Sequence, residues 1–273
     1  MNIINIEHIS KLFGDKLIFD DASFGLQEGD KVGIVGINGT GKSTLLRMVA
    51  GEETPDSGQI IRQNNLKMAY LPQTPEFPKD ATVLSYALSG DEEEWQVQSN
   101  LVQLGITEYD AKLDTLSGGQ RRKVALAKVL ASDFDVLILD EPTNHLDNAM
   151  LSWLEDYMKN YRGTVFMVTH DRYFLDRIVN RIFSFEGDGK VRQFEGGYSD
   201  YLICKELEGL DTEMSLKGHA AGTEEQPKKA ESSSKDTWKQ REPKLKFTFK
   251  EQREFESIDD DIAKLEEKIE TLD

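Results

Sequence analysis

The sequence has little cysteine, no long apolar run and few positive charges. Its single cysteine, Cys204, excludes a disulfide within the chain and is typical of a reducing compartment. We expect Cys204 to fill space in the core, because no neighbouring motif would activate its thiol. No apolar run approaches the ~20 residues of a membrane span, and the N-terminus lacks a basic region followed by an apolar block. These absences predict a soluble, unexported and cytoplasmic protein with no membrane span.

Positive charge is scarce overall but concentrated in one place. Fifty acidic residues against 33 Lys and Arg give a formal net charge of −17. This charge disfavours non-specific binding to the phosphates of nucleic acids. Residues 228–250 are the exception, since eight bases and three acids leave this stretch at about +5. Contact with RNA or DNA through this stretch is one hypothesis, and ordinary solvated charge is the other.

The composition indicates an α/β body followed by two different segments. Hydrophobic residues make up 38% of the 273 residues, enough for a sizeable core. We place a compact domain at 1–205, a flexible charged linker at 206–245 and the start of a coiled-coil helix at 246–273. The last segment carries an apolar stripe too short to be stable without a partner helix. The stripe consists of Phe255, Ile258, Ile262, Leu265, Ile269 and Leu272.

Short apolar runs predict the strands of the body. Three of them suit a parallel sheet buried on both faces, at residues 31–35, 136–139 and 164–168. Two earlier runs, 3–9 and 17–26, predict antiparallel strands. The glycines between 181–185 and 190–194 predict a hairpin.

A phosphate-binding motif follows the run at 31–35. Residues 36–44 read GINGTGKST, which matches G-x4-GK[ST] between a predicted strand and a predicted helix, the context that the motif requires. Its glycines let backbone N–H groups turn toward phosphates, and the helix start adds its positive dipole end. We expect ATP to be bound with Mg²⁺, Lys42 reaching the β- and γ-phosphates and Ser43 ligating the metal. The expected contacts are Gly36, Asn38, Gly39, Thr40, Gly41, Lys42, Ser43 and Thr44.

Two adjacent acids end the run at 136–139. The buried strand would deliver Asp140 to Mg²⁺, with Glu141 one residue further out to orient and polarise the attacking water. An apolar run ending in two acids is a weak signal alone. Behind a phosphate loop it becomes a strong one.

Residues 116–120 read LSGGQ about 20 residues before the acidic strand, which resembles the signature of the ATP-binding cassette superfamily. The resemblance covers residues 1–205. It implies a P-loop cassette with a mixed sheet core, an antiparallel β subdomain and a helical signature subdomain. It also implies that Phe13 stacks on adenine, that Gln73 reaches Mg²⁺ and the attacking water, and that His170 contacts the γ-phosphate. Phe19 and Phe24 are alternatives to Phe13, since a strand-edge phenylalanine is commonly a core residue.

In this superfamily one nucleotide lies between the P-loop of one cassette and the LSGGQ of another. The resemblance therefore implies that the signature residues serve a nucleotide held by a second cassette. A chain with one cassette completes the site most simply as a homodimer formed on ATP binding, with hydrolysis dependent on that dimerisation. The signature residues concerned are Ser117, Gly118, Gly119 and Gln120.

Several segments resemble the ABC-F class, soluble proteins that act on ribosomes or nucleic-acid processes. They are EPTNHLD at 141–147, VTHDRYFLDRI at 168–178, GGYSDYL at 196–202 and residues 246–269, which resemble the start of a C-terminal coiled-coil extension. ABC-F proteins usually carry two cassettes joined by a long helical arm, whereas this sequence has one cassette and no arm. A natural single-cassette member, an internal deletion and an engineered product all stay open.

Three functions are compatible with these motifs. The first is a soluble ABC-F-type ATPase acting on the ribosome and translation, or on a nucleic-acid process through the basic linker and coil. The second is the nucleotide-binding subunit of an ABC transporter, against which the NHLD segment and the tail argue. The third is an ATP-binding remnant without productive turnover. The sequence does not choose between ribosome, DNA and permease as targets, nor does it indicate an antibiotic phenotype.

Overall fold

The computed structural model describes residues 2–14, 16–88, 90, 93–187 and 189–218, with side chains up to residue 208. The predicted coiled coil and most of the predicted linker lie outside the described residues. The strands are β1 Asn2–Phe13, β2 Lys16–Gln27, β3 Lys31–Gly36, β4 Ser57–Arg62, β5 Met68–Leu71, β6 Val136–Asp140, β7 Thr164–Val168, β8 Arg181–Phe185 and β9 Val191–Glu195. The helices are α1 Lys42–Ala50, α2 Val83–Ala87, α3 Glu94–Gln103, α4 Gly118–Ala131, α5 Asn148–Asn160, α6 Arg172–Ile178 and α7 Tyr198–Gly218, with a 3-10 turn at Leu113–Thr115.

The strands form two sheets, which confirm the predicted α/β class. The smaller sheet is antiparallel in the order β2-β1-β4. The larger has the order β5-β6-β7-β3-β8-β9 and is parallel except for β9, which pairs with β8 as the predicted hairpin. Because β3 lies between β7 and β8, the loop after it emerges at the centre of the larger sheet.

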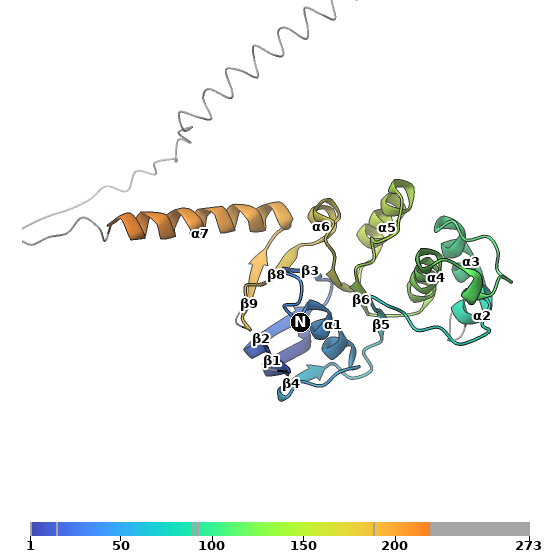
Figure 1. Cartoon of the computed structure of the whole chain (residues 1–273), viewed down its shortest axis with the longest axis horizontal. Coiled ribbons are helices and arrows are strands. Elements are labelled where there is room, and N and C mark those ends of the chain that lie inside the picture. The colour runs from blue at the N-terminus through green and yellow to red at the C-terminus, as the bar shows by residue number, and fades with distance from the viewer. Residues whose placement is uncertain (1, 15, 89, 91–92, 188, 219–273) are drawn as a thin grey trace, which may run out of the picture. The chain divides into compact units, whose positions relative to one another are not determined.

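The larger sheet is buried on both faces by different layers (Figure 1). On one face, Val32 and Ile34 of β3 join a core with Leu45 and Leu46 of α1 and the inner side of the smaller sheet. On the other face, side chains such as Leu139 pack with the helices α5 and α6. Alternate residues of each strand therefore serve opposite layers, as the period of two in a strand requires.

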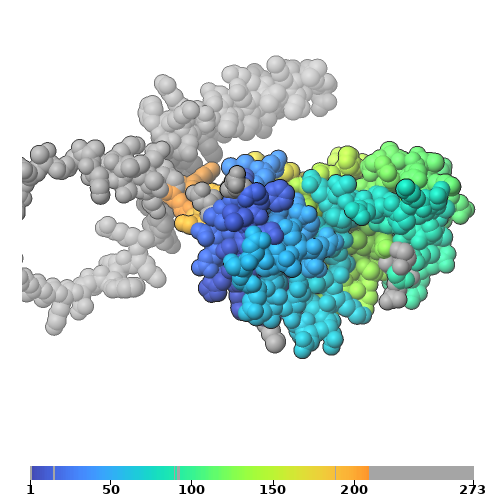
Figure 2. Space-filling view, turned by 60° about the horizontal axis from the view of Figure 1, so that its bottom comes forward, coloured from blue at the N-terminus to red at the C-terminus, as the bar shows by residue number. Residues whose placement is uncertain are grey.

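A group of helices forms the signature subdomain at one end of this body. Helix α3 packs on α4, and Asn100 on α3 donates from its amide nitrogen to the carbonyl oxygen of Ala127 at 3.2 Å. In Figure 2 the green surface of these helices lies at the opposite end of the described body from the blue antiparallel strands. The helical subdomain implied by the resemblance is thus present, along with the mixed sheet and the antiparallel subdomain.

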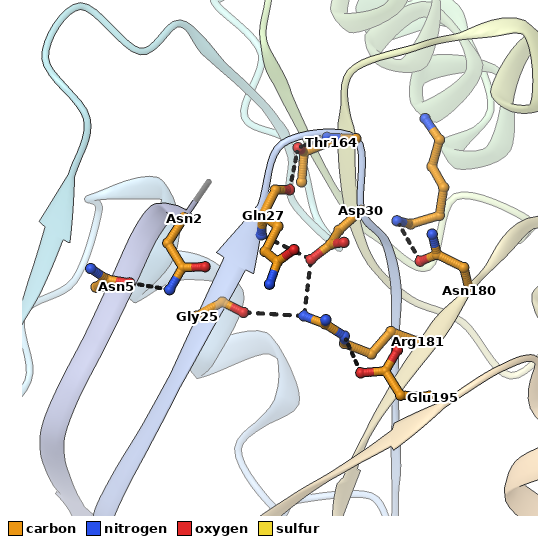
Figure 3. Close-up of polar contacts among 11 residues, drawn as sticks. Asn2, Asn5, Gly25, Gln27, Asp30, Thr164, Asn180, Arg181 and Glu195 are labelled. Atoms are coloured by element: carbon orange, nitrogen blue, oxygen red, sulfur yellow. Dashed lines mark hydrogen bonds and ion pairs between the residues drawn. The ribbon is translucent and has the colours of Figure 1, made fainter.

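Polar contacts hold the two sheets together where β3 begins, at the other end of β3 from the phosphate loop (Figure 3). Arg181 Nη1 donates to Asp30 Oδ2 at 3.0 Å, and its Nε donates to Glu195 Oε1 at 3.1 Å. Asp30 Oδ2 also accepts the backbone N–H of Gln27 at 2.8 Å. Since Gln27 ends β2 and Arg181 starts β8, this cluster fixes the smaller sheet against the larger one.

Helix α7 passes through residue 205, where the sequence places the end of the cassette. Its packing side is a stripe of half-buried residues at spacings of three and four, Tyr198, Tyr201, Lys205 and Glu208. Cys204 falls beside this stripe and is exposed, so the prediction of a core cysteine is wrong. Among the described helices, none is a candidate for a membrane-spanning segment.

Candidate functional site

The loop between β3 and α1 has the backbone that the motif predicts. Gly36, Gly39 and Gly41 all adopt positive φ angles, of 152°, 78° and 99°. At Gly41 a Cβ atom would lie 2.0 Å from Cγ2 of Ile18, so only glycine fits there. The loop turns into α1 at Lys42, which places the N-terminal end of that helix under it.

Lys42 is folded against this loop and is only 8% exposed. Its Nζ donates to the carbonyl oxygens of Gly36 at 2.9 Å and Ile37 at 3.0 Å. Burial lowers the pKa of the Lys42 ammonium, and the nearby carboxylates of Glu141 and Asp140 oppose this shift. The charge is therefore held at the centre of the loop, facing the two acids.

Asp140 ends β6, whose five residues are all buried between β5 and β7. Its side chain is 1% exposed, and neither carboxylate oxygen has a hydrogen-bond partner among the described residues. Burial raises the pKa of the Asp140 carboxyl, and the nearby cations of Arg122 and Lys42 oppose this shift. An unpartnered buried carboxylate is costly. A divalent cation would satisfy it, so this site fits Mg²⁺.

Glu141 follows in a left-handed backbone conformation, with φ of 55°. Its N–H donates to the carbonyl oxygen of Val168 at 2.8 Å, which ties it to the end of β7. The carboxylate is buried and meets His170, whose backbone N–H donates to Oε2 at 3.3 Å and whose Nε2 lies 3.4 Å from Oε1. Burial raises the pKa of the Glu141 carboxyl, with His170 opposing that shift.

Neighbouring helix caps fix the loops around these acids. Asp171 accepts the N–H of Phe174 at 3.0 Å and starts α6 directly after His170. Asp147 accepts the N–H of Met150 at 2.9 Å and starts α5 at the end of the loop that leaves Glu141. Both acids act as helix N-caps, so each loop ends at a defined position.

One cavity of about 400 Å³ gathers most of the predicted residues from five separated segments. Predicted residues that line it are Phe13, Asn38, Gly39, Gly41, Lys42, Ser43, Thr44, Gln73, Asp140, Glu141 and His170. Phe13 is 68% exposed at this cavity, whereas Phe19 and Phe24 are buried in the core. Gly36 lines an adjacent cavity of about 410 Å³, and the Thr40 hydroxyl donates to the Ile37 carbonyl oxygen at 2.8 Å.

The signature residues lie elsewhere on the surface of the chain. Ser117 caps α4, and its hydroxyl accepts the N–H of Gln120 at 3.3 Å while Gln120 Oε1 accepts the N–H of Ser117 at 3.0 Å. Ser117, Gly118 and Gln120 are exposed, and Gly119 faces His145. None of the four lines the cavity at the phosphate loop. Within one chain, the structure does not bring the LSGGQ segment to that cavity.

Three further residues line the cavity that the sequence did not predict as site residues, and one of them is Val168 at the end of β7. Arg47 lies one helical turn after Ser43 on α1, and this spacing of four places both on one face of the helix. Ile18 comes from β2, opposite Gly41. The helical spacing offered a signal for Arg47, while Ile18 is indistinguishable in sequence from other strand residues.

Comparison with known proteins agrees with this geometry. The family described as ABC transporter matches residues 19–144. The chain is 38% identical over 245 residues to the uncharacterized ABC transporter ATP-binding protein YfmR of Bacillus subtilis, covering 74% of the chain and 39% of the relative. It is 35% identical over 215 residues to the energy-dependent translational throttle protein EttA of Escherichia coli, covering 73% and 38%. A match to the ATP-binding protein Uup-like of Haemophilus influenzae is 31% identical over 282 residues and covers 99% and 60%.

A solved structure supports the fold assignment. It is a dimeric post-hydrolysis state of an ATP-binding cassette bound to ADP and phosphate, with a TM-score of 0.61 at 24% identity, covering 70% of this chain and 98% of that one. The chain spans less than two thirds of the length of the curated relatives it matches. From the motif, the cavity and these matches, the chain contains a P-loop ATP-binding cassette domain, of which residues 19–144 match the family described as ABC transporter.

Proposed function

We propose that the chain is a cytoplasmic ATPase of the ABC-F type that acts on translation or on a nucleic-acid process. The observation that carries the proposal is the single cavity where the phosphate loop, the Asp140–Glu141 pair and His170 meet. These are the groups that ATP hydrolysis requires, namely a phosphate cradle, a metal ligand and a carboxylate for water.

Each side of the cavity has a distinct task in this proposal. Backbone N–H groups of the loop and the Lys42 ammonium hold the β- and γ-phosphates, and the exposed ring of Phe13 stacks on adenine. Ser43, Gln73 and Asp140 hold Mg²⁺, which when bound neutralises charge on the phosphate oxygens.

Glu141 orients the attacking water and accepts its proton. Its raised pKa brings the carboxylate closer to the basicity that proton transfer near neutral pH requires. His170 holds the other side of that carboxylate and extends toward the γ-phosphate. The pair forms the hydrolytic end of the cavity.

A second cassette completes the site. Ser117 through Gln120 are exposed at the start of α4, where helix N–H groups suit an anionic partner, and they lie outside their own chain's cavity. We infer that they contact the nucleotide held by another copy, in a homodimer formed on ATP binding. Both copies then carry identical sites.

Translation is the favoured target because one relative is named an energy-dependent translational throttle protein. The test is co-sedimentation of the Glu141→Gln variant with ribosomes in ATP, compared with ADP. ATP-dependent ribosome binding supports the ABC-F role. Co-purification with a membrane permease would instead indicate a transporter subunit, and tight ATP binding without turnover at any protein concentration would indicate a binding-only cassette.

A further inference from the structure

The guanidinium of Arg122 on α4 donates to three backbone carbonyls, all of residues that line the cavity. Its Nη1 donates to the carbonyl oxygen of Gln73. Its Nη2 donates to the carbonyl oxygens of Asp140 at 2.5 Å and Glu141 at 2.8 Å. The side chain is half-buried and remains a cation, since a guanidinium is not deprotonated in proteins. One side chain thus joins the signature helix to two of the segments that carry cavity residues, the one at Gln73 and the one at Asp140–Glu141.

The backbone at Glu141 needs such support. A left-handed conformation is unfavourable at a residue with a Cβ, and Glu141 has φ of 55°. Besides Arg122, the Glu141 carbonyl oxygen accepts the N–H of Asn144 at 3.3 Å. This conformation accompanies the contact between the carboxylate and His170. Charged donors make stronger hydrogen bonds than neutral ones, so Arg122 is the main anchor of this carbonyl.

We propose that Arg122 is a positioning residue that holds the Glu141 carboxylate and the Gln73 loop in register with each other. The planar fork of the guanidinium suits this task, because its two terminal nitrogens reach carbonyls from separate segments at once. A lysine has one ammonium and cannot reproduce the fork. The proposal rests on the proposed function insofar as Glu141 acts on the attacking water.

Arg121 provides a matched control one residue earlier on the same helix. Its guanidinium carbon lies 5.9 Å from the centre of the Phe77 ring, and its half-buried side chain resembles that of Arg122 in size and charge. The Arg121 variant therefore tests whether the loss of any arginine at the start of α4 has the same effect as the loss of the Arg122 hydrogen bonds to the three carbonyls.

The experiment compares Arg122→Met, Arg122→Lys and Arg121→Met in the full chain. Steady-state turnover of Mg-ATP gives kcat and KM, calorimetry gives the Kd for ATP, and thermal melting checks folding. A misplacement of about 1 Å can lower a rate on the order of 10²-fold. We expect a loss of that size in kcat for Arg122→Met, a smaller loss for Arg122→Lys, and a Kd for ATP unchanged in both. Arg121→Met should turn over at nearly the wild-type rate.

Wild-type kcat in Arg122→Met, a parallel loss of ATP affinity, or an equal loss in Arg121→Met would overturn the proposal. If Arg122→Met does not fold, Arg122→Lys decides, with reduced kcat at unchanged Kd supporting it and wild-type kcat overturning it. Glu141→Gln separates the two levels of the account. If Glu141→Gln turns over ATP at the wild-type rate, the proposed function is wrong. If Glu141→Gln does not hydrolyse ATP while Arg122→Met is fully active, only the role of Arg122 is wrong.

Discussion

Glu141 and His170 meet through two contacts, one from the backbone N–H of His170 to Oε2 at 3.3 Å and one between Nε2 and Oε1 at 3.4 Å. The first contact fixes where the carboxylate lies, and the second places the imidazole beside it. Because Glu141 belongs to the segment after β6 and His170 to the segment after β7, adjacent parallel strands bring the pair together. The hydrolytic end of the cavity is therefore set by strand order.

Replacing Glu141 by Gln should abolish turnover and leave ATP binding intact. The amide keeps the shape of the side chain but cannot accept a proton, and a general base contributes on the order of 10²–10⁴-fold to a rate. Phosphate release measures the loss in kcat, and calorimetry measures the retained Kd. Glu155→Gln, a charge change on α5 away from the cavity, is the control and should hydrolyse ATP normally. Normal turnover in Glu141→Gln would show that Glu141 does not accept the proton of the attacking water.

Replacing Asp140 by Asn should stabilise the nucleotide-free protein while abolishing Mg²⁺-dependent hydrolysis. Burial raises the pKa of Asp140 above its ordinary value, so the ionised carboxylate lowers the stability of the folded state. Asn keeps buried polar atoms but carries no charge, so the variant avoids the cost of burying a carboxylate, and its Tm should rise. Thermal melts in EDTA measure this change, and an unchanged or lower Tm would contradict it.

The same pKa shift makes the stability of the wild type depend on pH. A carboxyl whose folded pKa lies above its unfolded pKa binds more protons in the folded state, so its contribution to stability falls as pH rises through the folded pKa. Relative to Asp140→Asn, wild-type Tm should therefore improve as pH is lowered from neutrality. Parallel Tm curves for the two proteins would show that Asp140 does not cause the dependence.

In a plot of kcat against pH, the midpoint of the acid limb should lie above the ordinary Glu pKa of 4.5, because burial raises the pKa of Glu141. Only the ionised carboxylate accepts a proton, so kcat rises with pH through that pKa. A pH–rate profile at saturating Mg-ATP measures the limb. A midpoint at or below 4.5 would contradict the assignment of this buried carboxyl to the rate.

Replacing Phe13 by Ala should weaken ATP binding. Stacking of a base on an aromatic ring is worth about 1–3 kcal/mol by alanine substitution, and Phe13 is exposed at the cavity. Phe13→Trp should restore affinity. Leu12→Ala is the matched control, since Leu12 is an exposed neighbour on β1 that does not line the cavity. Equal ATP affinities for Phe13→Ala and the wild type would contradict the prediction that Phe13 stacks on adenine.

Local sequence features predicted the strands that end at functional residues. The run at 31–35 and the run at 136–139 are apolar, short and followed by distinctive residues, and both are strands. Strands β4 and β5 were not predicted, because β4 has no fully buried residue and β5 has only four residues. Neither strand therefore forms an apolar run like those of β3, β6 and β7.

The parts of the site that escaped prediction depend on tertiary contacts. Arg122 is one of three consecutive basic residues after the signature, and the sequence alone does not tell which of them reaches the loops. The exposure of Cys204 depends on which side of α7 packs on the body. In both cases the residue type was visible, but its orientation required the fold.

If a second chain completes the cavity, a mixture of two inactive variants should recover part of the ATP turnover. Lys42→Ala removes the phosphate lysine, and Ser117→Arg blocks the signature of α4. A mixed dimer then has one site damaged on both sides and one site with both sides intact. Random pairing of equal amounts should restore about a quarter of wild-type ATP turnover, whereas no recovery from a mixture shown to form mixed dimers would contradict the shared site.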